Sequence, residues 1–395
     1  MMSHTPDEPP PGPDPHRTAV LRSHVREAAR ELREAGLEID RDPTAIDRHL
    51  HLAAVDIMRR CTVPVEYLAE PVRAGGHTFD MSSCLEHTIT IEELSYGDAG
   101  FMLACPGPLM SGVAVSALGD DKQRHAYYQR LAGPDPVWTF FGLTEPEKGS
   151  AATELETALT PDGDGFRLDG AKAYVGNAAY AQLGVVFCRR APGPLGIEAV
   201  LVDTSSPGFH AEPIPTVGMR GARISAITLR DVRVEREQIL GYDTLKPTRR
   251  GLVGAIRTLQ RFRPVLAGTA VGLARAVLDH VREQRPAPTG TARLRYEEVR
   301  DRLAAVRRRN YEVAAAIDAG SVRADRIAAV KTRAAELAEE ATVVAAELLG
   351  PGALAADPYL NKLHRDARAF EFMEGTGHIQ RLAVFQGVVK RTFLA

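Results

Sequence analysis

Hydrophobic residues recur with a helical period along the first third of the chain. Between Arg17 and Leu131 they return every three or four positions, within segments rich in good helix formers. This pattern predicts a helical N-terminal domain over 17–137. We expect its helices over Thr18–Glu34, from Thr44 with Thr44 as the cap, from Pro64, over Ser82–Leu94 capped by Ser82 or Ser83, over Gly107–Leu118 and over Lys122–Leu131.

The pattern changes to short alternating runs after Trp138. Clusters of Gly, Pro and Asp separate these runs, and Pro161–Gly165 and Ser205–Gly208 are the strongest turn signals. Strands at this spacing predict a small barrel or sandwich over 138–244. We expect strands in Glu154–Leu159, Gly165–Leu168, Leu183–Cys188, Ile197–Val202 and Ile224–Leu229.

A helical period returns after Gly241 and lasts to the end of the chain. Val265–Arg282 carries small residues that permit close helix packing, and Leu294–Ala319 and Ala324–Leu349 are long and amphipathic. Such lengths predict a helical bundle over 245–395. A shorter helix is expected over Arg365–Met373, with another beginning after Gly377.

The net charge and the length of the apolar runs make two classes of function less expected, nucleic-acid binding and a membrane-spanning role. The net charge is −2 and charged residues make up 25% of the 395 residues, so bulk charge gives no reason to expect nucleic-acid binding. No apolar run approaches the roughly 20 residues that span a bilayer. Residues 1–16 are rich in Pro and Asp and are expected to form a disordered tail rather than a signal peptide.

The four cysteines also bear on the cellular compartment. Cys61, Cys84, Cys105 and Cys188 are scattered without a C-x-x-C spacing. We expect buried thiols in a reducing cytoplasm, with no disulfide and no metal site. The predicted localisation is therefore cytoplasmic.

One carboxylate, that of Glu374, is a candidate general base. Glu374 follows the helical run that ends at Met373, and it precedes Gly375, a residue that tolerates left-handed backbone angles. A carboxylate at such a helix–glycine–helix corner can point into a cleft, where desolvation raises its pKa toward that of a working general base. A solvated cap carboxylate is the alternative for this short motif taken alone.

Three further segments of the chain carry short motifs in addition to the one around Glu374. Phe141–Ser150 contains Thr144-Glu145-Pro146 and then Gly149-Ser150, a loop whose backbone can approach a planar ring or a phosphate. Leu168–Ala178 contains Gly170, Lys172 and Asn177 at fixed spacing. Arg263-Pro264 opens a helical run, and Glu374-Gly375-Thr376 is followed by Ile379-Gln380-Arg381.

In this order and spacing, the motifs resemble those of the acyl-CoA dehydrogenase family. The resemblance runs from about Arg17 to the end and implies a mainly α fold with a central β domain: an N-terminal helical domain, a middle β-barrel and a C-terminal four-helix bundle. It implies an FAD-dependent enzyme that removes two hydrogens from an acyl thioester. Glu374 would take the α-proton and FAD the β-hydride.

The resemblance also implies a role for particular residues. Catalysis would fall to Glu374, with Arg263 beside it, and the thioester would meet Ser150, Met373 and Glu374. Phe262 stands where some branches of the family carry their catalytic Glu, which leaves Glu374 as the base. FAD would be bound by Phe141, Gly142, Leu143, Thr144, Gly149, Ser150, Tyr174, Val175, Gly176, Gly350, Gly352, Thr376 and Ile379.

The chain departs from the family pattern at several of these positions. Tyr174 stands where the family usually has Trp, and Gly176 stands where a Thr hydroxyl reaches the flavin. Met373 replaces a frequent Tyr above the substrate. The family's Arg-x-x-Phe-Gly contact to the FAD of a neighbouring subunit is missing, and Arg285 or Arg293 would have to replace it. These departures suggest a specialised branch of the family that acts in secondary metabolism.

The substrate carrier and the partners stay open at this point. The thioester is an acyl-CoA or an acyl-carrier-protein thioester, and the electron acceptor is a flavoprotein or oxygen. A homotetramer or homodimer is expected, without nucleic acid or membrane partners. The alternatives are a flavin-dependent monooxygenase, which Glu374 disfavours, and a non-catalytic homologue that has lost FAD.

Overall fold

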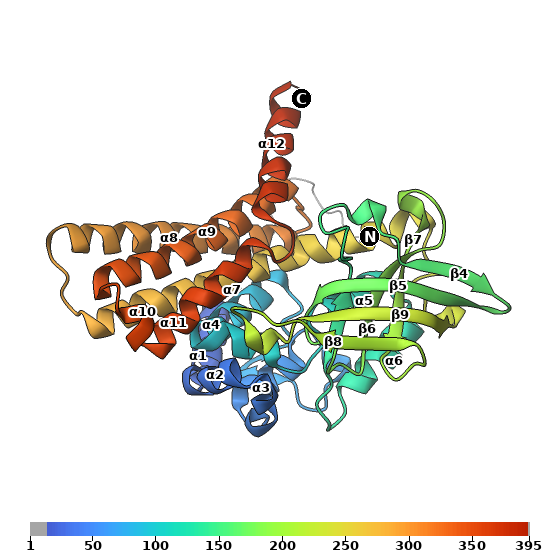
Figure 1. The fold of residues 1–395 in the computed structure, drawn as a ribbon, viewed down its shortest axis with the longest axis horizontal. Helices are drawn as coiled ribbons and strands as arrows, with labels where there is room; N and C mark the ends of the chain where they lie inside the picture. Colours follow the sequence, from blue (N-terminus) through green and yellow to red (C-terminus); the bar gives the residue numbers. More distant parts are fainter. Residues whose placement is uncertain (1–13, 394–395) are drawn as a thin grey trace, which may run out of the picture.

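The computed structural model describes residues 14–393, which form helices at both ends of the chain and a sheet between them (Figure 1). Residues 1–13 of the expected tail lie outside the described residues. Pro15 and His16 already belong to the first helix, which Asp14 caps by accepting from the His16 N–H. This order of helical, β and helical regions confirms the predicted fold class.

The N-terminal region consists of helices arranged around α4. It contains α1 (Pro15–Ala28), α2 (Leu32–Arg41), α3 (Ala53–Arg60), α4 (Cys84–Ala104), α5 (Leu109–Leu118) and α6 (Asp121–Leu131). Ser83 caps α4 by accepting from the Glu86 N–H at 3.1 Å, as the sequence predicts. Gln123 completes a capping box with Asp120 and donates to the Glu237 and Ile239 carbonyls, which ties α6 to the segment that follows the sheet.

Several N-terminal elements differ from the prediction. The single helix expected over Thr18–Glu34 is two helices, and α2 continues through Gly36 because this glycine lies against α4. A Cβ on Gly36 would lie 2.2 Å from the Asp98 Cγ. Asp42, rather than Thr44, caps the next turn, since its carboxylate accepts from the Thr44 N–H at 3.0 Å.

A hairpin stands where the sequence suggested only a helix from Pro64. A short 3₁₀ helix over Val65–Tyr67 is followed by β1 (Val72–Ala74) and β2 (His77–Phe79). Gly75 and Gly76 supply the two positive φ angles of the connecting turn. The predicted Ser82–Leu94 helix extends to Ala104, although Asp98 inside it has non-helical angles.

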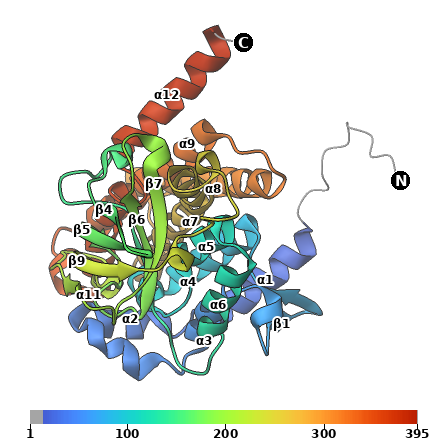
Figure 2. The same ribbon diagram turned by 90° about the vertical axis from the view of Figure 1, so that its right-hand side faces the viewer.

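The middle region is one sheet of seven strands, curled over the helices (Figure 2). The strand order is β3-β6-β4-β5-β9-β8, and β7 pairs with β6. The strands are β3 (Thr139–Gly142), β4 (Ala158–Asp162), β5 (Gly165–Val175), β6 (Leu183–Arg189), β7 (Ile197–Asp203), β8 (Phe209–Pro213) and β9 (Ser225–Val234).

The strand predicted over Glu154–Leu159 begins only at Ala158. The preceding residues serve another purpose, because the Glu156 and Thr157 N–H groups donate to the Glu145 carboxylate at 2.6 and 2.8 Å. These hydrogen bonds hold the loop after β3 instead of extending the β4–β5 ladder.

The C-terminal region packs three long helices together: α7 (Leu252–Gln284), α8 (Gly290–Asp318) and α9 (Ala324–Leu349). The short α10 (Ala353–Ala356), α11 (Pro358–Ala367) and α12 (Gly377–Phe393) follow. α7 is longer than predicted because it begins before Pro264 and carries this proline inside it. The helix expected over Arg365–Met373 ends at Ala367 and continues as a 3₁₀ helix to Glu371.

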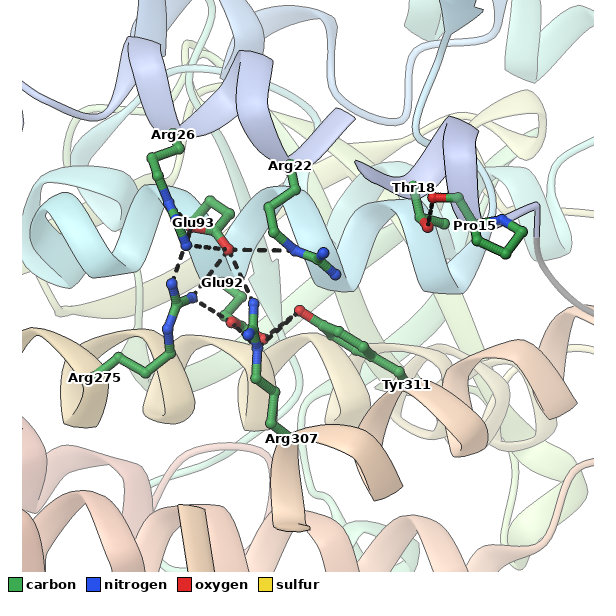
Figure 3. Close-up of polar contacts among 9 residues, drawn as sticks. All are labelled: Pro15, Thr18, Arg22, Arg26, Glu92, Glu93, Arg275, Arg307 and Tyr311. Carbon is green, nitrogen blue, oxygen red and sulfur yellow. Dashed lines mark hydrogen bonds and ion pairs between the residues drawn. The ribbon is translucent and has the colours of Figure 1, made fainter. Parts of the chain in front are cut away.

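Buried charges join the N-terminal helices to this bundle. Glu92 and Glu93 of α4 are fully buried and face arginines from three other helices (Figure 3). Arg26 of α1 donates to Glu93 at 2.9 Å, Arg307 of α8 lies 2.6 Å from Glu92, and Arg275 of α7 contacts both carboxylates. These charge-assisted contacts hold α4 against α1, α7 and α8.

The four cysteines are buried and free. Within residues 14–393 there is no helix long and apolar enough to cross a membrane. The same residues contain no group of three or more His, Cys, Asp and Glu side chains that could hold a metal ion.

Candidate active site

Glu374 lies in a tight turn between the 3₁₀ helix Arg368–Glu371 and α12. Its φ of 56° and the 96° of Gly375 are both left-handed, an uncommon conformation for a glutamate. The Glu371 carboxylate accepts from the Gly377 N–H at 3.0 Å and so caps the start of α12. The corner predicted from the sequence is therefore present, with the carboxylate residue itself in the strained position.

Side chains from three helices hold the carbonyls of this turn. Arg263 of α7 donates through Nε to the Glu374 carbonyl at 3.1 Å. Gln380 of α12 donates to the Glu374 and Gly375 carbonyls, and Lys331 of α9 donates to the Gly375 carbonyl at 2.8 Å. The turn is thus fixed from α7, α9 and α12 together, which maintains the left-handed angle of Glu374.

A cavity of about 1140 Å³ opens beside this turn. It exceeds the roughly 300–1,000 Å³ of an ordinary small-molecule pocket, as a site for both a cofactor and a substrate requires. Its walls come from the C-terminal end of α4, the start of α5, β3, β5, the loop before β9, α7, α11 and the 371–379 turn. Thirteen of the residues predicted for the site line it: Phe141, Leu143, Thr144, Gly149, Ser150, Tyr174, Val175, Gly176, Arg263, Met373, Glu374, Thr376 and Ile379.

Three predicted cofactor residues lie elsewhere. Gly142 belongs to β3, where a Cβ would lie 3.3 Å from the Lys172 Cγ rather than in the cavity. Gly350 and Gly352 follow the end of α9, and a Cβ on either would meet nothing within 4 Å. A contact between these two glycines and FAD remains a prediction.

Enclosure by protein changes the acidity of the candidate base. Glu374 lines the cavity, and its burial raises the pKa of the carboxyl to about 7. The positive charges of Arg263 and Lys331 act in the opposite direction and keep the ionised form accessible. A carboxylate with a pKa near neutrality is suited to accept a proton and release it again.

A buried ion pair orders the loop that carries Thr144. Lys172 of β5 lies 2.8 Å from the Glu145 carboxylate and also donates to the Leu143 carbonyl at 3.3 Å. Burial alone would raise the pKa of Glu145, but Lys172 and the two backbone donors lower it, so this carboxylate stays ionised. The loop is therefore fixed before any ligand arrives.

The end of β5 forms another wall of the cavity. Tyr174 and Asn177 have φ angles of 58° and 60°, and the exposed Tyr174 lines the cavity together with Gly176. Asn177 donates to the Leu103 carbonyl at 2.9 Å and accepts from Arg223 Nε at 3.0 Å. These hydrogen bonds anchor the end of the strand to α4.

Arg223 itself is buried without forming an ion pair to any carboxylate in residues 14–393. Its guanidinium lies over the rings of Trp138 and Tyr180, at 5.1 and 4.2 Å from their centroids. Burial lowers the pKa of Arg223 to about 10, so it is still charged at neutral pH.

A second buried charge group connects the three regions behind the cavity. Lys362 of α11 lies 2.7 Å from Asp98 of α4 and 2.6 Å from Asp366, one turn along its own helix. Asp366 also accepts from the Met219 N–H in the loop before β9. This group fixes α11, and hence the turn that follows it, relative to both the sheet and the N-terminal helices.

The sequence analysis gave no role to Gln380, which it named only as part of a motif, and it did not single out Lys331 or Lys362. A signal for Lys331 was present, since it stands on the buried face of α9 with Ile327, Ala334 and Ala338. A lysine at an apolar position of an amphipathic helix is seldom tolerated without a polar partner. The partners themselves, which are backbone carbonyls of a distant turn, leave no trace in the sequence.

Two glycines of the cavity wall allow a matched test of close packing. A Cβ on Gly218 would lie 2.2 Å from the Arg365 carbonyl oxygen, whereas one on Gly176 would lie 3.6 Å from the Ala222 carbonyl oxygen. We expect Gly218→Ala to lower the free energy of unfolding by roughly 1–3 kcal/mol, because the loop before β9 must move off α11.

The paired variant Gly176→Ala is expected to remain within about 0.5 kcal/mol of wild type, because its new methyl group makes only an ordinary contact. Denaturant titrations of both variants measure the difference. Equal destabilisation by the two substitutions would contradict the close contact between Gly218 and α11.

Two family descriptions match consecutive parts of the chain. The middle domain of acyl-CoA dehydrogenases matches residues 140–232, and their C-terminal domain matches residues 249–389. The chain belongs to the acyl-CoA dehydrogenase family. Among curated relatives of this acyl-CoA dehydrogenase homologue, the mitochondrial isovaleryl-CoA dehydrogenase of Pongo abelii is 27% identical over 334 residues, which cover 80% of this chain and 76% of the relative.

Solved structures share the fold across nearly the whole chain. The prolyl acyl carrier protein oxidase AnaB aligns with a TM-score of 0.82 at 21% identity, over 95% of this chain and all (100%) of AnaB. PigA with FAD and proline aligns with a TM-score of 0.83 at 19% identity, over 96% and 99% of the two chains. At these identities the alignments establish the fold alone.

Membership identifies the protein as a flavoprotein oxidoreductase of the acyl-CoA dehydrogenase type, with FAD as its cofactor. The cavity fits such a group. Neither a Cβ on Gly149 nor one on Gly176 would meet backbone closer than 3.6 Å, so both leave space for a ring to approach the main chain. Thr144, Ser150 and Thr376 contribute hydroxyl groups to the same wall.

Proposed function

We propose that this protein catalyses the FAD-dependent α,β-dehydrogenation of an acyl thioester, with Glu374 as the base that removes the α-proton. Membership of the family supports dehydrogenation of thioesters in general. The position of Glu374 supports it as the base, because this residue lines the cavity from a fixed turn and its pKa is about 7.

Particular residues would have separate roles in this dehydrogenation. The Glu374 carboxylate takes the proton from the α-carbon, while FAD, when bound, accepts the hydride from the β-carbon. Within residues 14–393 the Glu374 N–H donates no hydrogen bond, so it is available to the thioester oxygen, where negative charge develops. Arg263 adds positive charge next to the same position.

The remaining predicted residues have supporting roles in this proposal. Phe262 and Met373 line the cavity near Glu374, and their side chains would exclude water from the reacting carbons. Ser150 and Met373 would contact the acyl thioester. FAD would be bound by the residues of β3, its following loop and the end of β5, with Thr376 and Ile379 opposite them.

The acyl carrier is the next question. The name of AnaB, which shares the fold, refers to an acyl carrier protein, so it favours a carrier-protein thioester as the substrate. The name of the isovaleryl-CoA dehydrogenase refers to an acyl-CoA, so it favours an acyl-CoA thioester. We infer that this chain acts on one of these two thioesters. The apolar residues Phe262 and Met373 line its cavity.

A pairwise substrate test decides between the two carriers. Purified enzyme is mixed without oxygen with each of a set of acyl-CoA thioesters and with the same acyl groups on a carrier protein. We expect flavin absorbance to bleach at least roughly tenfold faster with one carrier for a matched acyl group, since that carrier contributes its own binding energy to the transition state. Bleaching by neither carrier would contradict the proposed function.

The assembly is proposed to be a homodimer or homotetramer. α12 projects from the body of the molecule (Figures 1 and 2), and its Leu382, Phe385 and Val388 side chains are exposed. A second copy would cover this apolar face, and it could bring Gly350 and Gly352 to the cofactor of its neighbour. A flavoprotein or oxygen would accept the electrons, and the proposed compartment is the cytoplasm.

A further inference from the structure

Lys331 is a fully buried lysine with an unusual set of partners. It lies on the inner face of α9 and is 1% exposed. Its ammonium donates to two backbone carbonyls, those of Gly375 at 2.8 Å and Glu371 at 3.2 Å. No carboxylate in residues 14–393 forms an ion pair with it, although a buried ammonium usually requires one.

These two carbonyls bracket the candidate base. Glu371 ends the 3₁₀ helix before the turn, and Gly375 follows Glu374 directly. Arg263 and Gln380 occupy the Glu374 carbonyl between them. Without Lys331, the Glu371 carbonyl would lose its donor and the Gly375 carbonyl would lose one of its two donors, while Glu374 would have to keep its left-handed φ of 56°.

The charged groups around Glu374 come from three elements. Arg263 of α7 and Lys331 of α9 are positive, and Glu371 of the 3₁₀ helix is negative. Burial lowers the pKa of Lys331 to about 8, against the raising effect of Glu371 and Glu374. The ammonium is therefore still charged at the pH where Glu374 ionises, and each charge favours the other.

We propose that Lys331 is a positioning residue for Glu374: it clamps the Glu371 and Gly375 carbonyls so that the carboxyl faces the cavity, and it supplies positive charge that favours the ionised carboxylate. Lys331 does not line the cavity, so it acts through the turn rather than on the substrate. The consequence for catalysis rests on the proposed function, but the effect on Glu374 does not.

A direct titration of Glu374 tests this role in the FAD-bound protein. The carboxylic-acid C=O stretch of Glu374 is followed by infrared difference spectroscopy against pH, and its band is assigned by its loss in Glu374→Gln. We expect Lys331→Met to move the midpoint upward by about one pH unit, because a nearby opposite charge is removed. Lys331→Arg is expected to keep the midpoint near the wild-type value.

A control on the same helix separates this effect from a general loss of charge. Arg333 is partly exposed on α9, pairs with Glu336, and its replacement in Arg333→Met should leave the Glu374 midpoint unchanged. An unchanged midpoint in Lys331→Met, or an equal shift in Arg333→Met, would overturn the proposal. Should Lys331→Met fail to fold, the same titration on Lys331→Gln decides, since glutamine keeps one donor and removes the charge.

The kinetic consequence has its own readout. The rising limb of kcat/KM against pH should shift with the infrared midpoint in Lys331→Met, so that the rate below the wild-type midpoint falls roughly tenfold for a shift of about one unit. A wild-type enzyme that fails to bleach with any thioester would refute the proposed function, yet the infrared result would still decide the role of Lys331.

Discussion

Glu374→Gln is expected to produce a folded, yellow protein whose flavin is bleached by thioester roughly 10²–10⁴ times more slowly than in wild type. Glutamine keeps the size of the side chain and cannot accept the α-proton. The carbonyl contacts from Arg263, Gln380 and Lys331 go to the backbone of the turn, so they survive the substitution. Stopped-flow absorbance of the FAD-bound variant without oxygen measures the loss.

The matched control is Glu340→Gln. Glu340 of α9 pairs with Arg295 and Arg302 and does not line the cavity. Its amide variant should bleach at nearly the wild-type rate. If Glu374→Gln also bleached at the wild-type rate, the base would have to be another group and the proposed mechanism would be wrong.

The wild-type enzyme should show the matching pH dependence. Glu374 works as a base only in its ionised form, and burial raises its pKa to about 7. We therefore expect kcat/KM to rise with pH through about 7 and then to level off, whereas the rising limb should be absent in Glu374→Gln.

Lys362→Met is expected to destabilise the folded protein by roughly 3–5 kcal/mol, the usual effect of removing one partner from a buried ion group. Lys362 is buried between Asp98 and Asp366, so its loss leaves two carboxylates facing each other without a cation. Denaturant titration of the purified protein measures the change. The exposed Lys122 provides the control, because Lys122→Met removes the same charge from the surface.

The destabilisation of Lys362→Met should shrink as the pH falls. Burial, together with Asp366, already raises the pKa of Asp98, and loss of Lys362 raises it further. A carboxyl with a raised folded-state pKa favours the fold at pH values below its unfolded pKa, and that advantage is lost as the pH rises through the folded one. A deficit that is independent of pH would contradict this account of the buried group.

Short motifs predicted the segments of the candidate site, and periodicity predicted the long helices. The corner at Glu374 and the loop after Phe141 could be recognised from their turn residues. Gly375 tolerates left-handed backbone angles, and Pro146 and Gly149 favour a turn. Ala324–Leu349 was predicted to the residue, since a long amphipathic helix between clear breaks leaves little freedom. The resemblance to a family then placed these segments around one site.

The missing parts depend on contacts between distant segments. Lys362 and Asp98 are 264 residues apart, and neither position announces its partner. α2 runs through Gly36 only because Asp98 lies against it, and β4 starts late because two of its expected N–H donors serve Glu145. In each case a tertiary contact overrides the local preference of the sequence.

The order in which the cavity walls occur along the chain affects its biosynthesis. The wall begins with Leu103 and is completed only by Ile379, and the turn that carries Glu374 is among its last parts. During translation the sheet and the N-terminal helices can therefore emerge well before a pocket exists to receive a cofactor. Ribosome-bound intermediates that stop short of residue 379 should fail to retain FAD. Binding of FAD is therefore expected to be a late event in the maturation of this protein.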